Sequence, residues 1–328
     1  MAPAPAGIPP LASGPALAVV LATDCFATLR PVIAALRRQE ARGRIELVLV
    51  APPGGLAHVD EWQVAGFAAL RCVEVPSVLD LAAARAAGVR AATAPIVFLG
   101  ETHTYVQPGW AEALLRAFEH PWAAVVPEVG NANPSGAVSW ASYLLDYATW
   151  GPGRPAGEIR DPLIYNSAYR RDVLLGFGDR LERALEPAWE AMRPALWEGG
   201  HRVWFEPSAR ILHLNVARLG GLLWEKLYAG LLVADNRARR WSRGRRVVYF
   251  LASPLIPAVL VWRVLGVWAG TRARERLPWG TLPLIAVAAA AKGAGEMLGG
   301  VLGAPQLAVT GMNEIEVHKV RFAGRSPS

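Results

Sequence analysis

An acidic side chain and an imidazole stand two positions apart, directly after a short apolar run. Residues 96–99, Ile-Val-Phe-Leu, are four consecutive apolar residues, a pattern typical of a central strand covered on both faces. Gly100 allows the chain to turn where that strand ends, and Glu101 and His103 follow. Ligands of open α/β sheets bind just beyond the carboxyl ends of the strands. The spacing therefore predicts that Glu101 and His103 lie at a ligand site, and both side-chain types bind metal ions.

The segments around this pair alternate between strand-like and helix-like patterns. Apolar runs predict strands at residues 16–22, 45–50, 69–75, 96–99 and 123–129. Helical spacing predicts helices at residues 28–39, 60–68, 78–93 (with Arg85 and Arg90 off its apolar face), 108–119 and 138–148. Strands and helices that alternate in this way form parallel βαβ units. We therefore expect an α/β fold with a mostly parallel sheet flanked by helices.

The chain continues with shorter elements. Strand patterns at residues 164–166, 202–206 and 211–215 are expected, and the first of these is expected to turn into a helix at residues 168–172. Residues 180–198 predict a helix that Pro187 and Pro194 break into pieces. Its carboxylates recur every fourth position, which places them on one helix face; they are Glu182, Glu186 and Glu190.

Composition limits the class of protein. The 328 residues suffice for one large domain or two modest ones, and hydrophobic residues make up 53% of them. The net charge is +7, but only three of the 34 basic residues are lysines, and no helix carries regularly spaced basic residues with polar base readers. Nucleic acid is therefore not an expected partner. Cys25 and Cys72 lack zinc-like spacing, and we expect two buried thiols in a reducing compartment.

The C-terminal third is the most apolar part of the chain. Residues 247–271 carry one charge, Arg263, and are long enough to span a bilayer with tilt, whereas the uncharged residues 277–291 are short for a full span. Six arginines between residues 237 and 246 precede the first run, a pattern that suits anionic headgroups or the cytoplasmic flank of a membrane segment. Three interpretations stay open: a transmembrane hairpin with cytoplasmic ends, amphipathic helices in the interface, or a soluble α-domain.

These patterns divide the chain into four parts. Residues 1–15 are rich in alanine and proline and are expected to form a disordered leader. We expect an α/β domain at residues 16–218, a helical membrane-associated region at residues 219–310 and a tail at residues 311–328.

Three motifs lie between residues 16 and 215. Ala-Arg-Ala-Ala-Gly occupies residues 84–88 in an expected helix, Pro-Gly-Trp at residues 108–110 follows the polar turn after residues 96–99, and residues 199–213 include a strand pattern that leads to a histidine. With these motifs, the sequence from about residue 16 to residue 215 resembles the family 2 glycosyltransferases of the GT-A fold, which have an Ala-Arg-Asn-x-Gly helix start, a Pro-x-Trp after their acidic turn and a closing strand that leads to a histidine. The chain departs from the family at its Asp-x-Asp knot, which here reads Gly-Glu-Thr-His at residues 100–103.

Two further departures concern carboxylates. The acidic residue usually found after the second strand is replaced by Ala-Pro at residues 51–52, and the Glu-Asp pair of the base helix is replaced by Ala-Trp at residues 188–189. The nearest carboxylates to that pair are Glu186 and Glu190. These differences leave the identity of the donor open and make loss of activity conceivable.

The resemblance implies transfer of a sugar from a nucleotide-sugar donor, with a divalent cation that neutralises the leaving diphosphate. Oxygen-rich knots suit Mg²⁺ or Mn²⁺, and an imidazole favours Mn²⁺. We expect Glu101 and His103 to be ligands, with His213 closing the site from the far segment. The alternatives are a solvated loop carboxylate, a hydrogen-bonded turn histidine and a satisfied histidine at a strand end.

Inverting transfer also requires a carboxylate that takes the proton of the acceptor hydroxyl. Glu186 is the first choice, because it precedes a proline in a bent helix, and Glu190 is the alternate. The competing interpretation places both on a solvated helix face.

Five further residues are candidates for binding the donor or acceptor. Thr23 and Asp24 follow the first strand and would meet the nucleotide, and Arg85 belongs to the helix motif of the family. Asn166 and Tyr169 suit recognition of hydroxyl groups. The simpler roles are a capping residue for Asp24, a turn former for Asn166 and a core aromatic for Tyr169.

We therefore expect an enzyme at the cytoplasmic face of a membrane that glycosylates a lipid-linked or cell-envelope acceptor. One rival is a catalytically inactive GT-A-like scaffold protein, which the missing acidic positions favour. A second rival is nucleotidyl transfer, against which the absence of a Gly-rich phosphate loop counts.

Overall fold

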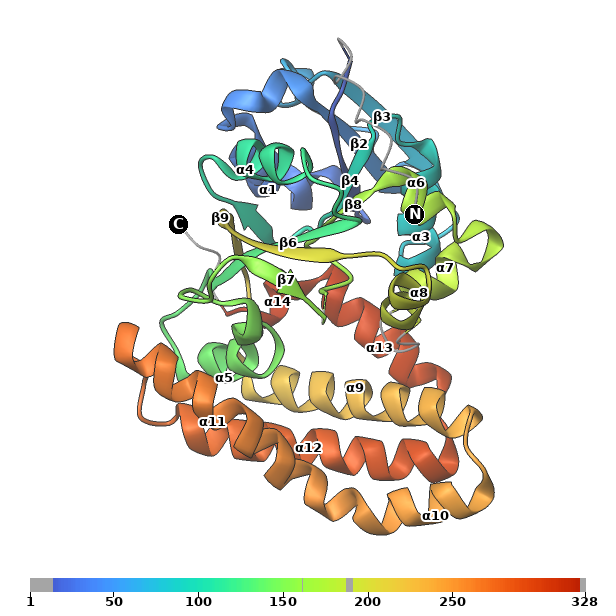
Figure 1. Cartoon of the computed structure of the whole chain (residues 1–328), viewed down its shortest axis with the longest axis vertical. Helices are drawn as coiled ribbons and strands as arrows, with labels where there is room; N and C mark the ends of the chain where they lie inside the picture. The colour runs from blue at the N-terminus through green and yellow to red at the C-terminus, as the bar shows by residue number, and fades with distance from the viewer. Residues whose placement is uncertain (1–13, 161, 187–190, 325–328) are drawn as a thin grey trace, which may run out of the picture.

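A nine-stranded mixed sheet forms the upper half of the molecule in the computed structural model, which describes residues 14–160, 162–186 and 191–324 (Figure 1). The strands are β1 (Leu17–Ala22), β2 (Ile45–Ala51), β3 (Ala69–Glu74), β4 (Ile96–Leu99), β5 (Thr104–Val106), β6 (Ala124–Asn131), β7 (Gly157–Ile159), β8 (Ala168–Arg170) and β9 (Val203–His213). Their order is β3-β2-β1-β4-β8-β6-β9-β5, and β7 pairs with β9. The leader expected at residues 1–15 lies outside the described residues apart from Gly14 and Pro15.

The sheet has a parallel half and a half rich in antiparallel pairs. Strands β3, β2, β1 and β4 run parallel, which confirms the predicted βαβ units. Strand β8 then inserts antiparallel between β4 and β6, and β5 pairs antiparallel with β9. The sequence did not predict β5 or β7, which are three residues each. Short strands of this kind form because a long neighbour, here β9, supplies their hydrogen bonds.

Strand β9 corrects the prediction of two separate strands. It runs unbroken from Val203 to His213, through Pro207. The register against β6 shifts between Pro127 and Glu128, so the residues around Pro207 form an irregularity in the ladder. A proline cannot donate a ladder hydrogen bond, and a bulge accommodates it without ending the strand.

Eight helices accompany the strands of the α/β domain within the described residues. They are α1 (Arg30–Arg37), α2 (Glu61–Val64), α3 (Leu81–Ala91), α4 (Trp110–Ala117), α5 (Ala137–Asp146), α6 (Arg171–Leu175), α7 (Leu181–Leu185) and α8 (Met192–Glu198). Short 3-10 turns are η1 (Phe26–Leu29), η2 (Glu40–Arg44), η3 (Ala148–Trp150) and η4 (Gly178–Arg180). The helix expected at residues 168–172 is instead strand β8 followed by α6.

The expected helix at residues 180–198 is also different in the structure. Helix α7 ends at Leu185, and Glu186 has an extended backbone (φ −82°, ψ 112°), as expected for a residue that precedes a proline. Glu182 and Glu186 therefore do not share one helix face. Pro194 does not break a helix, because it lies in the first turn of α8, where a missing N–H group has no consequence.

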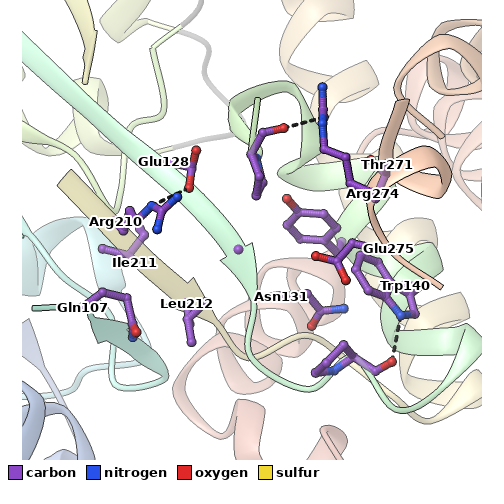
Figure 2. A pocket seen from close by; sticks show the side chains of 14 residues that line it. Gln107, Glu128, Asn131, Trp140, Arg210, Ile211, Leu212, Thr271, Arg274 and Glu275 are labelled. Atoms are coloured by element: carbon purple, nitrogen blue, oxygen red, sulfur yellow. Dashed lines mark hydrogen bonds and ion pairs between the residues drawn. The ribbon is translucent and has the colours of Figure 1, made fainter. Parts of the chain in front are cut away.

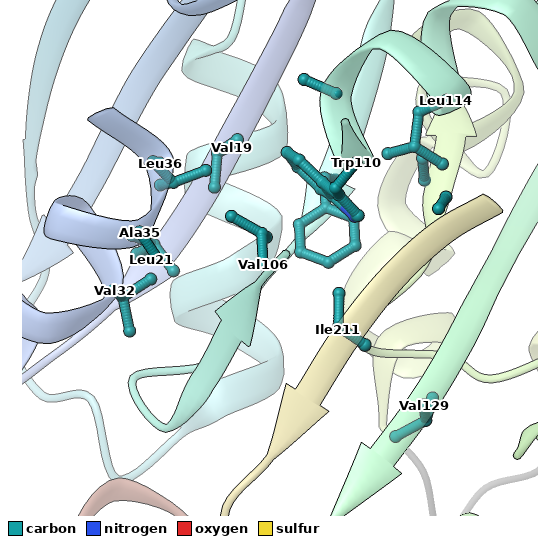
Figure 3. Packing of buried hydrophobic residues seen from close by; sticks show 14 of the residues in the cluster. Val19, Leu21, Val32, Ala35, Leu36, Val106, Trp110, Leu114, Val129 and Ile211 are labelled. Carbon is teal, nitrogen blue, oxygen red and sulfur yellow. The ribbon is translucent and has the colours of Figure 1, made fainter. Parts of the chain in front are cut away.

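Apolar side chains cover both faces of the sheet. On one face, Val19 and Leu21 of β1 pack with residues of α1 and α4 (Figure 3). Trp110 is fully buried there, and its ring meets Phe98 edge to face with centroids 4.8 Å apart. Full burial of such a side chain stabilises the fold by about 1.5–3 kcal/mol. The prediction that residues 96–99 form a strand covered on both faces is confirmed.

Helix α3 packs unusually close to the other face. A Cβ atom added to Gly88 would lie 2.4 Å from Val20 Cγ1 and 3.0 Å from Val50 Cγ2. Glycine is therefore required at this position, and the close approach also draws Arg85, one turn earlier, into the interior. Arg85 is only 3% exposed, so the expectation that it lies off the apolar face of its helix was wrong.

Four long helices form a layered region below the sheet (Figure 1). They are α9 (Leu219–Arg239), α10 (Arg243–Ala252), α11 (Ile256–Arg274), which the short turn η6 (Ser253–Leu255) joins to α10, and α12 (Thr281–Leu302). Helix α12 contacts α9 on one side and α10 and α11 on the other. Gly295 and Gly299 permit the first contact, since a Cβ atom on either would lie within 2.3 Å of a carbonyl oxygen of α9.

Two segments of this region are long and apolar enough to cross a membrane, residues 243–274 and 281–302. The first is 11% buried over its most apolar window and the second 44%. Large apolar side chains are correspondingly exposed on α10, η6 and α11; examples are Val248, Leu251, Leu255 and Trp262. The outer helices are therefore more open than α12, which also exposes some apolar side chains, among them Val301 and Leu302.

The chain end returns to the α/β domain. Helices α13 (Gln306–Val317) and α14 (Lys319–Phe322) lie between α9 and the sheet (Figure 1). Asn313 donates to the carbonyl of Leu79 at 2.6 Å, and the Ala217 N–H donates to the carbonyl of Phe322 at 2.9 Å. The boundary expected at residue 310 falls inside α13.

Candidate active site

Three side chains converge below the carboxyl end of β4. Glu101 and His103 lie in the turn after β4, and His213 is the last residue of β9. The turn and β9 meet because Thr104 pairs with His213 in the β5–β9 ladder. One ligand atom from each of the three residues lies within 4.8 Å of the others, and all three side chains are buried. The geometric part of the prediction, that these groups come together, is confirmed.

The spacing of the three groups fits a cation. His103 Nε2 lies 3.1 Å from His213 Nε2 and 3.6 Å from Glu101 Oε2, and His213 Nε2 lies 3.4 Å from the same oxygen. With metal–ligand bonds of about 2.1 Å, neighbouring ligand atoms are about 3.0 Å apart in an octahedral site and about 3.4 Å apart in a tetrahedral one. The donor set therefore suits a divalent metal ion such as Mn²⁺.

A network of asparagines orients His213. The Nδ1 atom of His213 lies 3.0 Å from Asn215 Oδ1, and the amide of Asn215 donates to Asn131 Oδ1 at 2.9 Å. A hydrogen bond at Nδ1 leaves Nε2 directed at the cluster with a free lone pair. Ser139, on α5, donates to Asn131 at 3.1 Å and to Asn133 at 2.9 Å. This hydrogen-bond network was not predicted from the sequence. Its sequence signal is the pair of asparagines, Asn131 and Asn133, two positions apart after a strand.

Two residues hold Glu101 from the other side. Arg85 Nη2 lies 3.5 Å from Glu101 Oε1, and the Asn166 amide donates to Glu101 Oε2 at 2.5 Å. Asn166 has a left-handed backbone (φ 56°), and its own N–H donates to the carbonyl of Leu99 at 2.7 Å. Asparagine tolerates this conformation better than most residues. Asn166 is thus a turn former and a positioning residue at once, and the two interpretations of it are not exclusive.

The electrostatics keep Glu101 and His103 in the protonation states that bind metal. Burial alone would raise the pKa of Glu101, but the imidazoles of His103 and His213 and the Arg85 guanidinium hold it well below the ordinary carboxyl value. Burial lowers the pKa of His103 well below its usual value, and the charge of Glu101 opposes this only in part. The carboxylate is therefore ionised and the His103 imidazole neutral at neutral pH.

The cluster opens on a cavity of about 390 Å³, here called the cleft pocket. Glu101, Arg85, His213 and Glu186 line its sheet side, and residues of α5, α9, α12 and α13 line the rest. Tyr165 also lines it, with the Arg85 guanidinium 3.4 Å above its ring centroid and its hydroxyl donating to the carbonyl of Leu185. The sequence patterns did not predict Tyr165 as an aromatic residue of the site.

The remaining candidates lie in different places. Thr23 is fully buried at the end of β1, with its hydroxyl 2.7 Å from the Cys25 carbonyl and 2.6 Å from Thr28 Oγ1, and Asp24 lies 3.6 Å from His318.

Tyr169 is fully buried in the core, and its hydroxyl donates to the carbonyls of Leu163 and Ile164. This placement corresponds to the core role, not to recognition of hydroxyl groups. Glu190 lies outside the described residues.

The two cysteines were expected to be buried. Cys25 and Cys72 are instead exposed free thiols. Cys25 follows β1 in an extended conformation and Cys72 lies on the edge strand β3, so neither site is covered by a second layer.

Buried charges connect the cleft pocket to the helical region. Lys226 on α9 pairs with Asp146 on α5 and with Glu225 at 3.1 Å, and Lys319 on α14 lies 2.9 Å from Glu225 and 2.6 Å from Glu316. Lys226, Lys319 and Lys292 of α12 all line the cleft pocket. These are the three lysines of the whole chain, in which 31 other basic residues are arginines.

A second pocket of about 360 Å³ lies between β6, β9, α5 and the end of α11 (Figure 2). Several of its polar side chains are engaged with the protein: Glu128 pairs with Arg210 at 3.0 Å, Trp140 donates to the Pro134 carbonyl at 2.7 Å and Arg274 donates to the Pro152 carbonyl at 2.6 Å. No group of three potential metal ligands occurs in it within the described residues. This second pocket offers no comparable chemistry.

Comparisons with known proteins agree with the geometry. Residues 18–176 match the family model described as glycosyl transferase family 2. The fold is similar to that of the mannosyltransferase PcManGT from Pyrobaculum calidifontis, solved with GDP-Man and Mn²⁺, with a TM-score of 0.50 and 15% identity over 86% of this chain and 88% of that one. This similarity shows a GT-A-like fold. No curated protein sequence matches the chain.

Two other structures are less similar. One is S. aureus TarS 1–349 in complex with UDP, at 13% identity and a TM-score of 0.43, covering 86% of this chain and 89% of that one. The other is GalNAc-T7 with UDP, GalNAc and Mn²⁺, at 15% identity and a TM-score of 0.43. The match covers 62% of this chain and spans only 44% of the length of GalNAc-T7.

Proposed function

Residues 18–176 belong to glycosyl transferase family 2, and from that premise we propose that the chain transfers a sugar, with inversion, from a nucleotide-sugar donor to a lipid-linked or cell-envelope acceptor. The observation that carries the proposal is the convergence of Glu101, His103 and His213 beside the cleft pocket, which Glu101 and His213 line. A divalent cation bound by these residues, Mn²⁺ or Mg²⁺, supplies the positive charge that a leaving diphosphate requires.

Arg85 suits a place beside that diphosphate. Its guanidinium is sandwiched between Tyr165 and Glu101, and its Nε and Nη1 groups have no hydrogen-bond acceptor among the described residues. Buried donors without acceptors are rare in folded proteins, so acceptor oxygens of a ligand are the natural partners for them. Phosphate oxygens match the planar fork of arginine particularly well.

Glu186 is the proposed general base. It lines the cleft pocket directly after α7, beside Tyr165, whose hydroxyl binds the preceding carbonyl. From that position its carboxylate takes the proton of an acceptor hydroxyl as the hydroxyl attacks the sugar, while the diphosphate leaves on the opposite side.

The far wall of the cleft pocket supports a lipid-linked acceptor. Ala229, Leu232 and Val233 of α9 and Val309 and Met312 of α13 give it an apolar surface. Lys292 lies in the same wall, and no carboxylate among the described residues is within ion-pair distance of it. An apolar chain with an anionic head would satisfy both features, because the lysine then gains a charged partner.

The helical region would hold the enzyme on the membrane that carries this acceptor. Its outer helices α10 and α11 expose apolar side chains, and clusters of arginine flank them at residues 237–246 and 272–276. The packing of α12 between α9 and these helices favours an interfacial position over a spanning hairpin. A location on the cytoplasmic face agrees with the excess of arginine before the first apolar run.

Transfer by the purified chain tests the proposal. With Mn²⁺ and a panel of nucleotide sugars, radiolabelled sugar should pass to a polyprenyl phosphate or glycolipid in detergent or vesicles. Glu186→Gln should lose the transfer and retain donor binding. If no nucleotide sugar binds the wild-type chain by calorimetry, the inactive scaffold is the better account.

A further inference from the structure

We propose that Glu316 of α13 is a fourth ligand of the cation site, so that the C-terminal helix pair completes the catalytic centre. This inference rests on the proposed cation site at Glu101, His103 and His213. It adds a residue that lies 140 positions beyond the segment matched by the family model, which ends at residue 176.

Glu316 lies beside one of the three predicted ligands but outside the group whose ligand atoms all lie within 4.8 Å of one another, so to bind the same ion its carboxylate must move towards Glu101 and His213. Its Oε2 atom lies 3.7 Å from His103 Nε2, close to the 3.6 Å that separates His103 Nε2 from Glu101 Oε2. With metal–ligand bonds of about 2.1 Å, either distance corresponds to a ligand–metal–ligand angle of about 120°, wider than the tetrahedral angle. Glu316 also lines the cleft pocket, so it faces the cluster from the side opposite the sheet.

Lys319 orients the Glu316 carboxylate. Its ammonium group donates to Glu316 Oε1 at 2.6 Å and to Glu225 Oε1 at 2.9 Å. One oxygen of Glu316 is therefore occupied by the lysine, and the other is left directed at His103. Supporting hydrogen bonds of this kind are typical of carboxylates that bind metal ions.

The position of α13 is fixed by contacts along its length. Ile315 and Val317, on either side of Glu316, are both buried, and Asn313 is hydrogen-bonded to the carbonyl of Leu79. Glu316 is thus held at the cluster by a packed helix and not by a loose chain end.

The charges of the four groups also balance. Glu101 and Glu316 bring two negative charges, which match a divalent cation, and the two imidazoles bring none when neutral. Two nitrogens and two carboxylate oxygens form a mixed donor set that suits Mn²⁺ better than a purely oxygen-bound Mg²⁺. The C-terminal helices would then serve catalysis as well as any role at the membrane.

Mn²⁺ titration of the full chain without nucleotide tests this inference, by calorimetry and by the electron paramagnetic resonance signal of free Mn²⁺. Glu316→Gln should weaken Mn²⁺ binding by about tenfold or more. Glu314→Gln is the matched control, because Glu314 is an exposed glutamate on the same helix, and it should bind Mn²⁺ like the wild type. Melting curves recorded without metal show whether each variant is folded.

The outcomes separate this inference from the proposed function. Wild-type Mn²⁺ affinity in a folded Glu316→Gln overturns the fourth ligand and leaves the three-ligand site standing, and tighter binding would show that Glu316 blocks the site. A wild-type chain that binds no Mn²⁺ overturns both. A measurement on the wild type does not depend on the folding of a variant: electron–nuclear double resonance with ¹³C-carboxyl glutamate should show two coordinated carboxylates, and a single one contradicts the proposal.

Discussion

The cleft pocket and the second pocket have similar volumes, about 390 and 360 Å³, but very different linings. At the cleft pocket, three buried ionisable groups from the turn after β4 and the end of β9 converge, with ligand atoms within 4.8 Å of one another. In the second pocket, Glu128 and Arg210 pair with each other (Figure 2), and no group of three potential metal ligands occurs there among the described residues. Size therefore does not distinguish the two pockets. Among the described residues, the group of three buried potential metal ligands does.

The largest effect is expected at Glu101. Glu101→Gln removes the carboxylate charge on which two imidazoles and Arg85 converge, and transfer should fall by about 10⁴-fold, because several kcal/mol of charge stabilisation depend on the bound cation. Initial rates with saturating donor and Mn²⁺ measure the loss. The same substitution in the second pocket, Glu128→Gln, should leave the rate unchanged; equal losses in both variants would remove the distinction between the pockets.

A loss of about 10³-fold in kcat is expected for Glu186→Gln, because a general base contributes roughly that factor. Binding of the nucleotide sugar should be unaffected, since the amide has the same shape. Glu182→Gln is the control, because Glu182 is half exposed and pairs with Arg90 at 3.1 Å on the outside. Unchanged kcat in Glu186→Gln would exclude this residue as the base.

Asn166→Gly is expected to weaken Mn²⁺ binding by about 10–100-fold. Glycine adopts the left-handed backbone of this position freely, so the variant removes only the amide that donates to Glu101. Calorimetric titration with Mn²⁺ measures the change, and the melting temperature of the metal-free variant should remain near that of the wild type. An unaltered affinity would mean that Glu101 does not depend on Asn166 for its position.

Lys292→Met should raise the KM for a lipid phosphate acceptor by about tenfold, since one charge-assisted contact contributes about 1.5–3 kcal/mol. The KM for the nucleotide sugar should not change. If the donor KM rises instead, Lys292 binds the donor diphosphate and the acceptor lies elsewhere. Lys292→Arg retains the charge and is the matched control.

The buried charges on α9 should appear in the pH dependence of stability. Burial raises the pKa of Glu225, but Lys226 and Lys319 outweigh it and lower the pKa to about 2. A carboxyl with a depressed pKa stabilises the folded state above its unfolded pKa of about 4.5, and this contribution, about 3 kcal/mol, is lost as the pH falls towards 2. Urea unfolding at a series of pH values should show this decline in the wild type. A decline of equal size in Glu225→Gln would assign it to other groups.

The sequence allowed the central part of the site to be predicted. Three features of the sequence were enough to predict that Glu101, His103 and His213 lie close together. They are the apolar run at residues 96–99, the polar turn after it and the resemblance at residues 199–213. Such local patterns are informative because burial on both faces of a strand requires a continuous apolar run. The parallel half of the sheet was predicted for the same reason.

The rest depends on tertiary contacts that local patterns do not carry. From the sequence, Arg85 was expected to lie off the apolar face of an alanine-rich helix. It is buried because α3 approaches the sheet closely at Gly88. Glu316 comes from a segment that looked like a simple tail, and its role requires the fold-back of α13 against α9. The sequence predicted two strands in place of β9, separated at Pro207, because a bulge that tolerates proline has no sequence signal of its own.

Thermal melting of the full chain with a panel of nucleoside diphosphates, with and without Mn²⁺, tests the central claim most directly. At least one diphosphate should raise the melting temperature only when Mn²⁺ is present, and His213→Ala should abolish the rise. A rise that is independent of Mn²⁺, or one that persists in His213→Ala, would contradict a cation held between the turn after β4 and the end of β9.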